Sequence, residues 1–493
     1  MSFQDVIPSE LKHDFLLSEI KTAKLEKKQN CLISVLLNAR SESLCFGSAM
    51  KNIKVNVITL GCPKNEVDSD AMKWILLQSG YQITEELRNA DIFVINTCGF
   101  IDQAKAESLD EIWKIINLKK MDGNKKLIVA GCLAQRYPDK LWKEIPEIDS
   151  IIGIGEIKNI GKVCEEVRKN KRICLITPPL SKYEHETVKR AVSDRPFAYL
   201  RIADGCNNLC SYCSIPGIRG PYRSRSTDSL LAEAEFLAGK GIKEINLIAQ
   251  DITLYGVDIY GKPQLPRLLS SLSKIPQIKW IRLLYTHPAH YSDELIQTIA
   301  SNPKVCKYLD LPLQHISDKL LSRMNRKVTR KKIINLIEKL RKEIPNLTLR
   351  TTFLVGFPGE TESDFNELLN FVEETRFDKV GIFPYSREED TKAYNLKNQI
   401  LSRIKQERWD RLFLLQQKIS LEKNQSRVGK KMTVLVEGKS KKNGCFGRSE
   451  AEAPEVDGLI HIKGERLNAG NFVKVKVTKA LDYDLVSKVE PNS

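Results

Sequence analysis

The chain has 493 residues, of which 42% are hydrophobic and 28% charged, and its formal net charge is +16. This length suffices for three domains, and no run approaches the roughly 18 apolar residues of a membrane span, which excludes an integral membrane protein. Twelve cysteines without a secretory leader indicate a reducing cytoplasm rather than a secreted, disulfide-bonded protein. The positive charge favours attraction to nucleic acid such as ribosomal RNA, although lysine-rich composition can also follow genome bias.

Residues 1–49 match no domain pattern. Their one apolar stretch, residues 31–37, is too short and too internal for a signal peptide, and several acidic residues argue against a transit peptide. The first strand-like segment begins just after Met50. We leave residues 1–49 unassigned and expect that Met50 is the functional start or that the extension is dispensable.

Three cysteines in the next part of the chain occupy the same place in three successive βα units. Each follows an apolar strand, stands beside a glycine and precedes a helical pattern. They are Cys62, Cys98 and Cys132, and they follow residues 55–60, 92–96 and 127–130. In an open parallel sheet, loops after neighbouring strands converge on one crevice. The sequence therefore predicts a shared three-thiolate iron site, whereas one such cysteine alone would be an ordinary packing residue.

The densest cysteine cluster is Cys206-Asn-Asn-Leu-Cys210-Ser-Tyr-Cys213. Three thiolates at this spacing can hold three irons of a 4Fe–4S cluster and leave the fourth iron open to chelate a small molecule. Structural zinc is the alternative, but zinc usually takes four ligands, and no fourth Cys or His lies nearby in sequence. A disulfide framework does not suit so long a chain.

Six short apolar runs alternate with amphipathic stretches after Pro196, which predicts parallel βα units and a partial (β/α)6 barrel. The runs are residues 197–202, 242–249, 280–285, 308–313, 347–355 and 380–384. In such barrels the chemistry lies at the carboxyl ends of the strands. The residues found there are the Cys206 loop, Gln250-Asp251, His287, Gln314-His315, Gly356 to Gly359 and Tyr385-Ser386. Each also has an ordinary structural interpretation, so we assign no catalytic residue among them.

From Lys430 onward the chain reads as short β segments separated by glycines and a charged loop. The segments are residues 432–436, 458–462, 471–477 and 483–489. This composition predicts a small five-stranded β-barrel of the OB type. A long helix over about 404–423 is expected to connect it to the preceding barrel.

The charged loop, residues 450–457, is called the acidic loop below; it carries Glu450, Glu452, Glu455 and Asp457. We interpret it as a docking surface for a basic protein, because four acids would repel a phosphate backbone. The alternative is an ordinary solvated loop. From Lys430 onward the chain holds 12 basic and 9 acidic side chains. That balance does not favour a surface for RNA alone.

The Cys-x3-Cys-x2-Cys spacing, with aromatic Tyr212 before the last cysteine, resembles the signature of radical S-adenosylmethionine (SAM) enzymes. In that family the open iron binds the amino and carboxylate groups of SAM, and one electron cleaves the sulfonium to a 5′-deoxyadenosyl radical. The resemblance places Tyr212 near the adenine as a SAM contact, although Tyr212 could equally be a packing residue.

The combination of both cysteine trios resembles the radical SAM methylthiotransferases over Lys51 to about Val489. Members of this family attach a CH3–S group to an unactivated carbon, and their small final barrel, the TRAM domain, docks the substrate macromolecule. The resemblance implies an α/β chain with two 4Fe–4S clusters and SAM. It implies a methylthiotransferase amino-terminal domain over 50–190 with the auxiliary cluster, a radical SAM barrel over 191–427 and a TRAM domain over 428–493.

Within this family the chain resembles the RimO branch, which modifies the β-carbon of an aspartate in ribosomal protein S twelve of the small subunit. The similar segments are residues 62–65, 96–102, 215–224, 309–315 and 447–458. The implied partners are that protein within the small ribosomal subunit and an electron donor such as flavodoxin or ferredoxin, with no membrane. The alternatives are a MiaB-like transfer RNA adenosine methylthiotransferase and, more distantly, a non-catalytic iron–sulfur protein that binds RNA or the ribosome.

Overall fold

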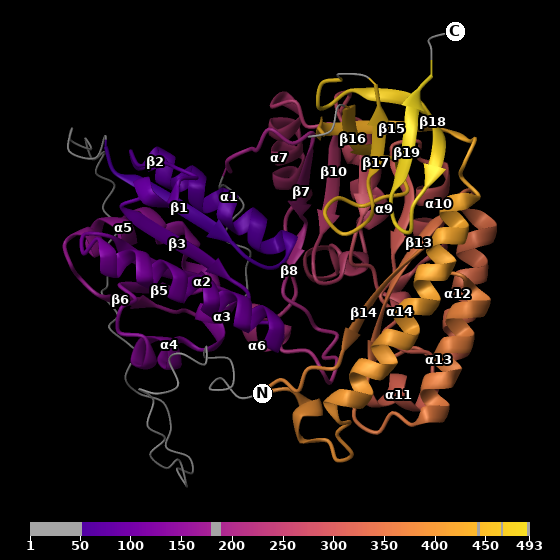
Figure 1. Cartoon of the computed structure of the whole chain (residues 1–493), viewed down its shortest axis with the longest axis horizontal. Coiled ribbons are helices and arrows are strands. Elements are labelled where there is room, and N and C mark those ends of the chain that lie inside the picture. The colour runs from indigo at the N-terminus through magenta and orange to yellow at the C-terminus, as the bar shows by residue number, and fades with distance from the viewer. Residues whose placement is uncertain (1–51, 179–188, 441–443, 465–466, 491–493) are drawn as a thin grey trace. The chain divides into compact units, whose positions relative to one another are not determined.

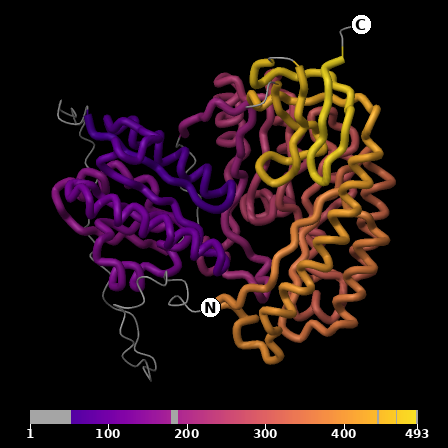
Figure 2. The backbone as a smooth tube through the Cα atoms, in the orientation of Figure 1, coloured from indigo at the N-terminus to yellow at the C-terminus, as the bar shows by residue number. Residues whose placement is uncertain are grey.

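The computed structural model describes residues 52–178, 189–440, 444–464 and 467–490 (Figure 1). They form two compact units: residues 52–178 with 189–191, and residue 192 onward. Figure 2 traces the backbone of each unit. The expected extension and Met50 lie outside the described residues.

The first unit is an open parallel sheet in the strand order β2-β1-β3-β4-β5-β6, and every neighbouring pair is parallel. Its strands are β1 (Lys54–Thr59), β2 (Gln82–Ile83), β3 (Ile92–Thr97), β4 (Lys126–Gly131), β5 (Ser150–Ile152) and β6 (Ile173–Leu175). Its helices are α1 (Pro63–Gln78), α2 (Asp102–Met121), α3 (Cys132–Arg136), α4 (Pro138–Glu144) and α5 (Ile160–Arg168), with the 3-10 turns η4 (Leu87–Asn89) and η5 (Ile154–Asn159).

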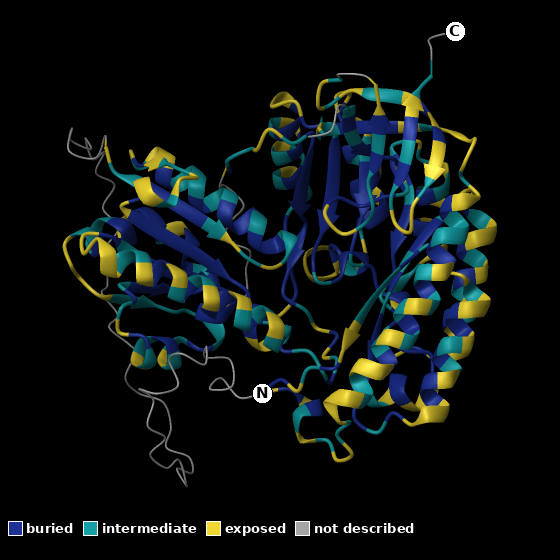
Figure 3. Ribbon diagram, viewed as in Figure 1, coloured by how far each residue is buried: buried dark blue, intermediate teal, exposed yellow. Residues whose placement is uncertain are grey.

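The central strands of this sheet are buried on both faces, as Figure 3 shows in dark blue. Every residue of β3 is buried. Phe93 and Ile95 belong to the core cluster that contains residues of α2, whereas Ile92 and Val94 belong to the cluster that contains residues of α1 and α5. Successive side chains of a strand point to opposite faces, and a parallel sheet covered on both sides reads as a continuous apolar run. The predicted open parallel α/β fold is confirmed.

The second unit begins with six parallel strands in the order β14-β13-β12-β11-β10-β7, which form an open sheet as expected for a partial barrel. They are β7 (Phe197–Arg201), β10 (Glu244–Ile248), β11 (Trp280–Leu283), β12 (Val305–Asp310), β13 (Thr348–Val355) and β14 (Lys379–Pro384), beside the short pair β8 (Ala203–Asp204) and β9 (Arg223–Ser224). The helices are α6 (Ile215–Arg219), α7 (Thr227–Gly239), α8 (Val257–Tyr260), α9 (Leu265–Leu272), α10 (Asp293–Ser301), α11 (Asp318–Arg323), α12 (Arg330–Glu343), α13 (Glu362–Thr375) and α14 (Ser402–Gln425), with η6 (Ile252–Leu254), η7 (Pro288–His290) and η8 (Lys392–Asn395).

The two faces of this sheet differ in chemistry. Ile245 and Leu247 of β10 join the large apolar core with residues of the covering helices. Glu244 and Asn246 alternate with them and lie on the other face, yet both are fully buried. The second face of the sheet is therefore polar, but it is closed to solvent at β10.

The third part is a closed five-stranded barrel in the order β15-β16-β17-β19-β18. Its strands are β15 (Lys431–Lys439), β16 (Gly444–Arg448), β17 (Ile460–Lys463), β18 (Phe472–Ala480) and β19 (Leu485–Val489). The predicted barrel is confirmed, although β16 was not among the expected segments. A Cβ at Gly447 of β16 would lie 2.1 Å from the Leu435 carbonyl oxygen, so glycine permits this strand to pair closely.

The interpretation of the acidic loop as a docking surface is wrong for its buried members. Glu452 and Asp457 each have side chains only 3% exposed. Arg427 lies 2.7 Å from the Glu452 carboxylate, and the Tyr308 hydroxyl of β12 donates to Asp457 over 2.8 Å. Burial opposes ionisation of Glu452, but Arg427 and Lys379 overcome it and hold its pKa at about 2. The loop contacts the polar face of the six-stranded sheet.

A buried ionic network joins the same two parts. Arg448 of β16 lies 2.7 Å from the Glu244 carboxylate of β10, and Arg282 of β11 lies 2.7 Å from its other oxygen. Arg448 also donates to Glu437 over 2.6 Å. Buried charges are tolerated only when paired. The small barrel is therefore fixed to the larger one by charges that neither part could bury alone.

Candidate functional site

Cys62, Cys98 and Cys132 follow β1, β3 and β4, which are neighbours in the sheet. Cys62 is the N-cap of the 16-residue helix α1, and Cys132 is the first residue of α3. The partial positive charge at a helix N-terminus favours a thiolate. The three loops thus leave one edge of the sheet, as the sequence predicted.

Asn65 in the first turn of α1 contacts all three loops. Its Nδ2 donates to the Leu60 carbonyl over 2.9 Å and to the Thr97 carbonyl over 3.0 Å. Its Oδ1 lies 3.7 Å from Sγ of Cys132. Asn65 could not be predicted from the sequence, because one asparagine inside a helix carries no signal of a contact between three distant loops.

The glycines beside the cysteines leave the space that brings these loops together. A Cβ at Gly61 would lie 2.7 Å from Cβ and 3.0 Å from Sγ of Cys98. A Cβ at Gly99 would lie 2.8 Å from Cα of Leu133 and 3.0 Å from the carbonyl carbon of Cys132. Each loop therefore packs against the next cysteine loop. The side chains of Cys62, Cys98 and Cys132, of which the last two are buried, are a donor set that fits a cluster with three protein ligands.

The Cys206 loop in the second unit is fixed by main-chain hydrogen bonds. The Cys206 N–H donates to the Gly220 carbonyl over 3.1 Å. Ser211 donates its N–H to Met324 and accepts the N–H of Ala393 at its carbonyl, over 3.0 and 2.7 Å. These hydrogen bonds hold the backbone of the segment that carries the three thiols.

The thiols of this loop lie in a desolvated setting beside one cation. Burial raises the pKa of Cys206 to about 11 and that of Cys213 to about 12. The Arg326 guanidinium, itself buried, lies 3.6 Å from Sγ of Cys210. Metal ligation requires thiolates, so binding releases protons, and Arg326 offsets part of the negative charge that results. This donor set also fits a cluster with three protein ligands.

Polar residues of the strand ends are connected to this loop. Asn208 donates to the Asp251 carboxylate over 2.8 Å. The same carboxylate accepts a hydrogen bond from Nδ1 of His290 over 2.9 Å. Asp251 follows β10 and His290 follows β11. The predicted grouping at the carboxyl ends of the strands is therefore present, and Asn208 and His290 are two members that the sequence did not indicate.

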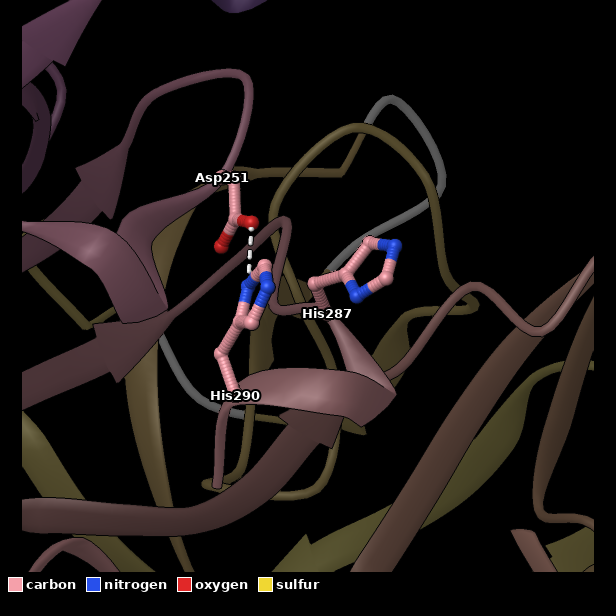
Figure 4. A group of neighbouring side chains, drawn as sticks. All are labelled: Asp251, His287 and His290. Carbon is pink, nitrogen blue, oxygen red and sulfur yellow. Dashed lines mark hydrogen bonds and ion pairs between the residues drawn. The ribbon is translucent and has the colours of Figure 1, made fainter. Parts of the chain in front are cut away.

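His287 stacks on His290, with ring centroids 4.7 Å apart and planes 24° apart (Figure 4). Its Nδ1 accepts the N–H of Ala289 over 3.2 Å, which leaves the proton on Nε2. That Nε2 is buried and has no hydrogen-bond partner in the described part of the chain. A buried, unpaired donor costs about 1–3 kcal/mol, so His287 fits an oxygen of a bound ligand.

Asp251, His287 and His290 also place three potential ligand atoms within 4.8 Å of one another. An imidazole binds a metal in the plane of its ring, and two stacked rings cannot share one ion in both planes. Figure 4 draws the hydrogen bond between Asp251 and His290, and Nδ1 of His287 already accepts the N–H of Ala289. The group is therefore a hydrogen-bonded support and not a cation site.

The remaining strand-end residues have structural roles. His315 is fully buried, and its Nδ1 accepts the N–H of Ser317 over 3.0 Å. Gln250 donates to Asp204 over 2.8 Å. Gly356 has φ +73°, and Glu360 accepts its N–H over 2.6 Å, so it forms a turn.

Tyr385 and Tyr212 belong to one apolar group. The Tyr385 ring packs against Phe357 with centroids 5.4 Å apart. Tyr212 lies against the cluster formed by Leu320, Met324, Phe357 and Tyr385, and burial raises its pKa well above the usual value. These contacts suit a packing role, and the contact of Tyr212 with SAM stays a prediction.

Three family descriptions match successive parts of the chain. They are "Uncharacterized protein family UPF0004" over 54–153, "Radical SAM superfamily" over 200–372 and "TRAM domain" over 428–489. The chain also resembles the solved structure of the radical SAM methyltransferase TsrM from Kitasatospora setae, with a TM-score of 0.50 and 14% identity over 67% of this chain and 73% of that one. At this identity the likeness concerns the fold alone. The fold and the matched domains define a radical SAM enzyme.

Curated relatives show to which family of radical SAM enzymes the chain belongs. Two proteins named "Ribosomal protein uS12 methylthiotransferase RimO" are those of Citrifermentans bemidjiense, 47% identical over 88% of this chain and 98% of the relative, and Caldanaerobacter subterraneus subsp. tengcongensis, 48% identical over 88% and 99%. The Geobacter sulfurreducens protein of that name is 46% identical over 88% and 98%. The chain belongs to the RimO family of radical SAM methylthiotransferases, whose cofactors are SAM and two 4Fe–4S clusters.

The helices that the structure describes do not combine the length and apolar character of a membrane span.

Proposed function

We propose that this chain methylthiolates the β-carbon of an aspartate in ribosomal protein uS12, within the small ribosomal subunit. Identity of about 47% with the named uS12 methylthiotransferases, across 88% of the chain, carries the proposal. The two cysteine trios at the ends of parallel strands support it, because that chemistry needs two separate sites. The domain limits 50–190, 191–427 and 428–493 are part of the proposal.

Cys206, Cys210 and Cys213 would hold the cluster that binds SAM, and Cys62, Cys98 and Cys132 would hold the auxiliary cluster. When bound, these groups supply the one-electron chemistry and the sulfur that the side chains of the protein lack. The contribution of the chain is to fix the two sets of thiols, to orient the ligands and to exclude water.

In the second unit, several contacts perform these tasks. The hydrogen bonds of Ser211 and Cys206 fix the loop, and Asn208, Asp251 and His290 connect it to the ends of two strands. The apolar cluster around Tyr212 keeps water from one side of the loop, and exclusion of water would limit side reactions of the chemistry that the bound groups supply.

His287 supplies a donor at the same place. Its Nε2–H is available to a carboxylate, which both SAM and the substrate aspartate carry. Burial lowers the pKa of His287 to about 2, so the ring is a neutral donor throughout the physiological range.

We also propose a flavodoxin or ferredoxin as the electron donor and the cytoplasm as the location. Twelve cysteines in a chain of this length support a reducing compartment.

The test is anaerobic reconstitution with iron and sulfide, followed by SAM, a reductant and either a uS12 peptide or unmodified transfer RNA. A gain of about 46 Da on the peptide aspartate, the mass of an added CH2S unit, supports the proposal. The same gain on transfer RNA alone would overturn the proposed substrate and retain the chemistry. Absence of both gains, with SAM cleaved, would contradict methylthiolation of either substrate.

A further inference from the structure

Two helical side chains of the first unit hold the cysteine loops by hydrogen bonds. They are Asn65 in the first turn of α1 and Ser108 in α2. Both residues are fully buried. Buried polar side chains are retained where hydrogen bonds satisfy them, so the partners of these two residues indicate what they do.

The side-chain amide of Asn65 uses both of its polar atoms on the loops. Its Nδ2 donates to the carbonyls of Leu60 and Thr97, and Sγ of Cys132 donates to its Oδ1 over 3.7 Å. The two carbonyls lie two residues and one residue before cysteines of the trio. An amide nitrogen carries two hydrogens, so these carbonyls fix the orientation of the amide and direct Oδ1 to Cys132.

The main chain around Asn65 is fixed as well. The Asn65 carbonyl accepts a hydrogen bond from Nδ2 of Asn96 over 2.8 Å, and the same Nδ2 donates to Oγ of Ser69 over 3.0 Å. The Thr59 hydroxyl donates to Oγ of Ser69 over 2.7 Å. Side chains therefore connect α1 to β1 and β3, the strands that lead into two of the cysteine loops.

Ser108 holds Cys98 by both polar groups of the cysteine backbone. The Cys98 N–H donates to Oγ of Ser108 over 3.0 Å, and the Ser108 hydroxyl donates to the Cys98 carbonyl over 2.9 Å. Nη1 of Arg136 donates to the carbonyl of the next residue, Gly99, over 2.9 Å. Because Arg136 belongs to α3, which begins at Cys132, this contact connects the second and third loops.

We propose that Asn65 and Ser108 are positioning residues of the auxiliary cluster site, which hold the cysteine loops in the arrangement that binds the cluster. The inference rests on the proposed function, which assigns Cys62, Cys98 and Cys132 to that cluster. Residues that orient the ligands of a metal site typically raise its affinity by about 10–100-fold. Neither residue supplies a ligand, so each acts through the cysteines.

A site made from three distant loops needs such positioning more than a site within one loop. Its cysteines lie 36 and 34 residues apart, and ordering each loop around a bound group would cost conformational entropy at the moment of binding. Hydrogen bonds that order the loops in the folded chain transfer this cost to folding. The cluster is then bound more tightly, because the site is already organised.

The test uses the full chain with the local trio removed, so that only the auxiliary cluster forms on reconstitution. This background carries Cys206→Ala, Cys210→Ala and Cys213→Ala. Asn65→Leu removes the amide at similar volume, and Asn56→Leu is the matched control. Asn56 is also buried in the first unit, and its Nδ2 donates to one main-chain carbonyl over 2.7 Å, away from the cysteine loops.

Ser108→Ala is a second and milder variant, because it removes a single hydroxyl. Its matched control is Ser150→Ala. Ser150 is fully buried in β5, and its hydroxyl has no hydrogen-bond partner within the described residues. Each chain is measured in three ways: release of iron to a chelator, the electron paramagnetic resonance spectrum of the reduced cluster, and urea unfolding of the metal-free chain.

Asn65→Leu should release iron at least about tenfold faster than the background chain, and Ser108→Ala about fivefold faster. Both should alter the resonance spectrum, since the cysteines then hold the cluster in a changed geometry. The controls should release iron at the background rate with an unaltered spectrum. Asn56→Leu should nevertheless lower the free energy of unfolding of the metal-free chain, because it leaves a buried carbonyl without its donor.

Two results would overturn the inference while iron still binds. One is unaltered iron release and spectrum in both variants. The other is release from the controls as fast as from the variants, which would assign the effect to general stability. If Asn65→Leu does not fold, the comparison of Ser108→Ala with Ser150→Ala decides. If the background chain binds no iron, the proposed role of the auxiliary trio fails, and the inference fails with it.

Discussion

The two cysteine trios are assembled in opposite ways. Cys206, Cys210 and Cys213 lie within eight consecutive positions, and hydrogen bonds to neighbouring loops fix the segment that carries them. Cys62, Cys98 and Cys132 lie 36 and 34 residues apart and share one sheet edge only because β1, β3 and β4 are neighbours. A local motif sets the first spacing, and the topology of a whole domain sets the second.

This difference has an energetic consequence. A site made by topology binds its group only when the domain is folded, so cluster binding adds to the stability of that domain. A site made within one loop can bind in a partly folded chain. The first unit should therefore depend on its cluster for stability more than the second unit does.

The largest expected effect concerns the local trio. Cys206→Ala should abolish reductive SAM cleavage. The loss should exceed the roughly 10–100-fold fall in activity that typically follows removal of a residue that only hydrogen-bonds to a metal ligand. Formation of 5′-deoxyadenosine under anaerobic reduction measures this loss. Cys174→Ala, in β6 of the first unit and outside both trios, is the control and should cleave SAM at the unaltered rate. Intact cleavage in Cys206→Ala would contradict the role assigned to this loop.

The next effect separates the two sites. Cys62→Ala should lower bound iron from about eight to about four atoms per chain, with SAM cleavage retained and methylthiolation of the uS12 peptide lost. The retained cleavage follows from the independence of the two donor sets. Iron analysis and mass spectrometry of the peptide on the same sample provide the measurement. Loss of SAM cleavage together with methylthiolation would show that the two sites cannot act separately.

Some residues of these sites could be predicted from the sequence and others could not. The strand–cysteine–glycine pattern predicted that Cys62, Cys98 and Cys132 lie at one edge of a sheet, because parallel sheets bring successive strand ends together. It could not identify Asn65, whose contacts to Leu60 and Thr97 exist only after folding. The acidic loop was misread for a related reason: sequence shows that Glu452 is charged but does not show that Arg427 buries against it. The strands of the partial barrel were predicted within a few residues, since apolar period and length define them.

A smaller effect tests the space between the loops of the first unit. Gly61→Ala places a Cβ 2.7 Å from Cys98 at a backbone φ of +90°. The strain should cost about 1–3 kcal/mol and lower the iron bound by the first unit. Gly123→Ala is the matched control, because nothing lies within 4 Å of its added Cβ. Urea unfolding and iron content of both variants give the answer, and equal behaviour of the two would mean that this space is not needed.

The role of His287 is tested by His287→Phe, which keeps a ring against His290 and removes the N–H. A hydrogen bond to a charged group contributes about 1.5–3 kcal/mol, so kcat/KM should fall by about tenfold or more, with iron content unaltered. A raised KM for SAM would assign the donor to the SAM carboxylate, and a raised KM for the peptide would assign it to the substrate. His461→Phe on the small barrel is the control. Unaltered kinetics in His287→Phe would leave the unpaired Nε2 without a function.

The smallest expected effect is a difference between the two units in how their free energy of unfolding depends on pH. Burial lowers the pKa of His315 to about 3, against about 6.5 in an unfolded chain. Below pH 6.5 the unfolded chain therefore binds a proton that the folded chain does not, so the free energy of unfolding falls as the pH falls. Between pH 6.5 and 5 this one group should cost the second unit about 2 kcal/mol.

The described part of the first unit contains no histidine, so its stability should change less over the same range. Hydrogen exchange at pH 7 and pH 5 can follow each unit separately within one chain. His315→Asn retains an acceptor for the N–H of Ser317 and cannot titrate, so it should reduce the stability at pH 7 and weaken the pH dependence of the second unit. Buried His287, whose pKa is also lowered, accounts for a remaining part of that dependence. His461→Asn should leave that dependence as it is. A steeper loss in the first unit than in the second would show that acid sensitivity follows the cluster site made by topology and not the buried imidazole.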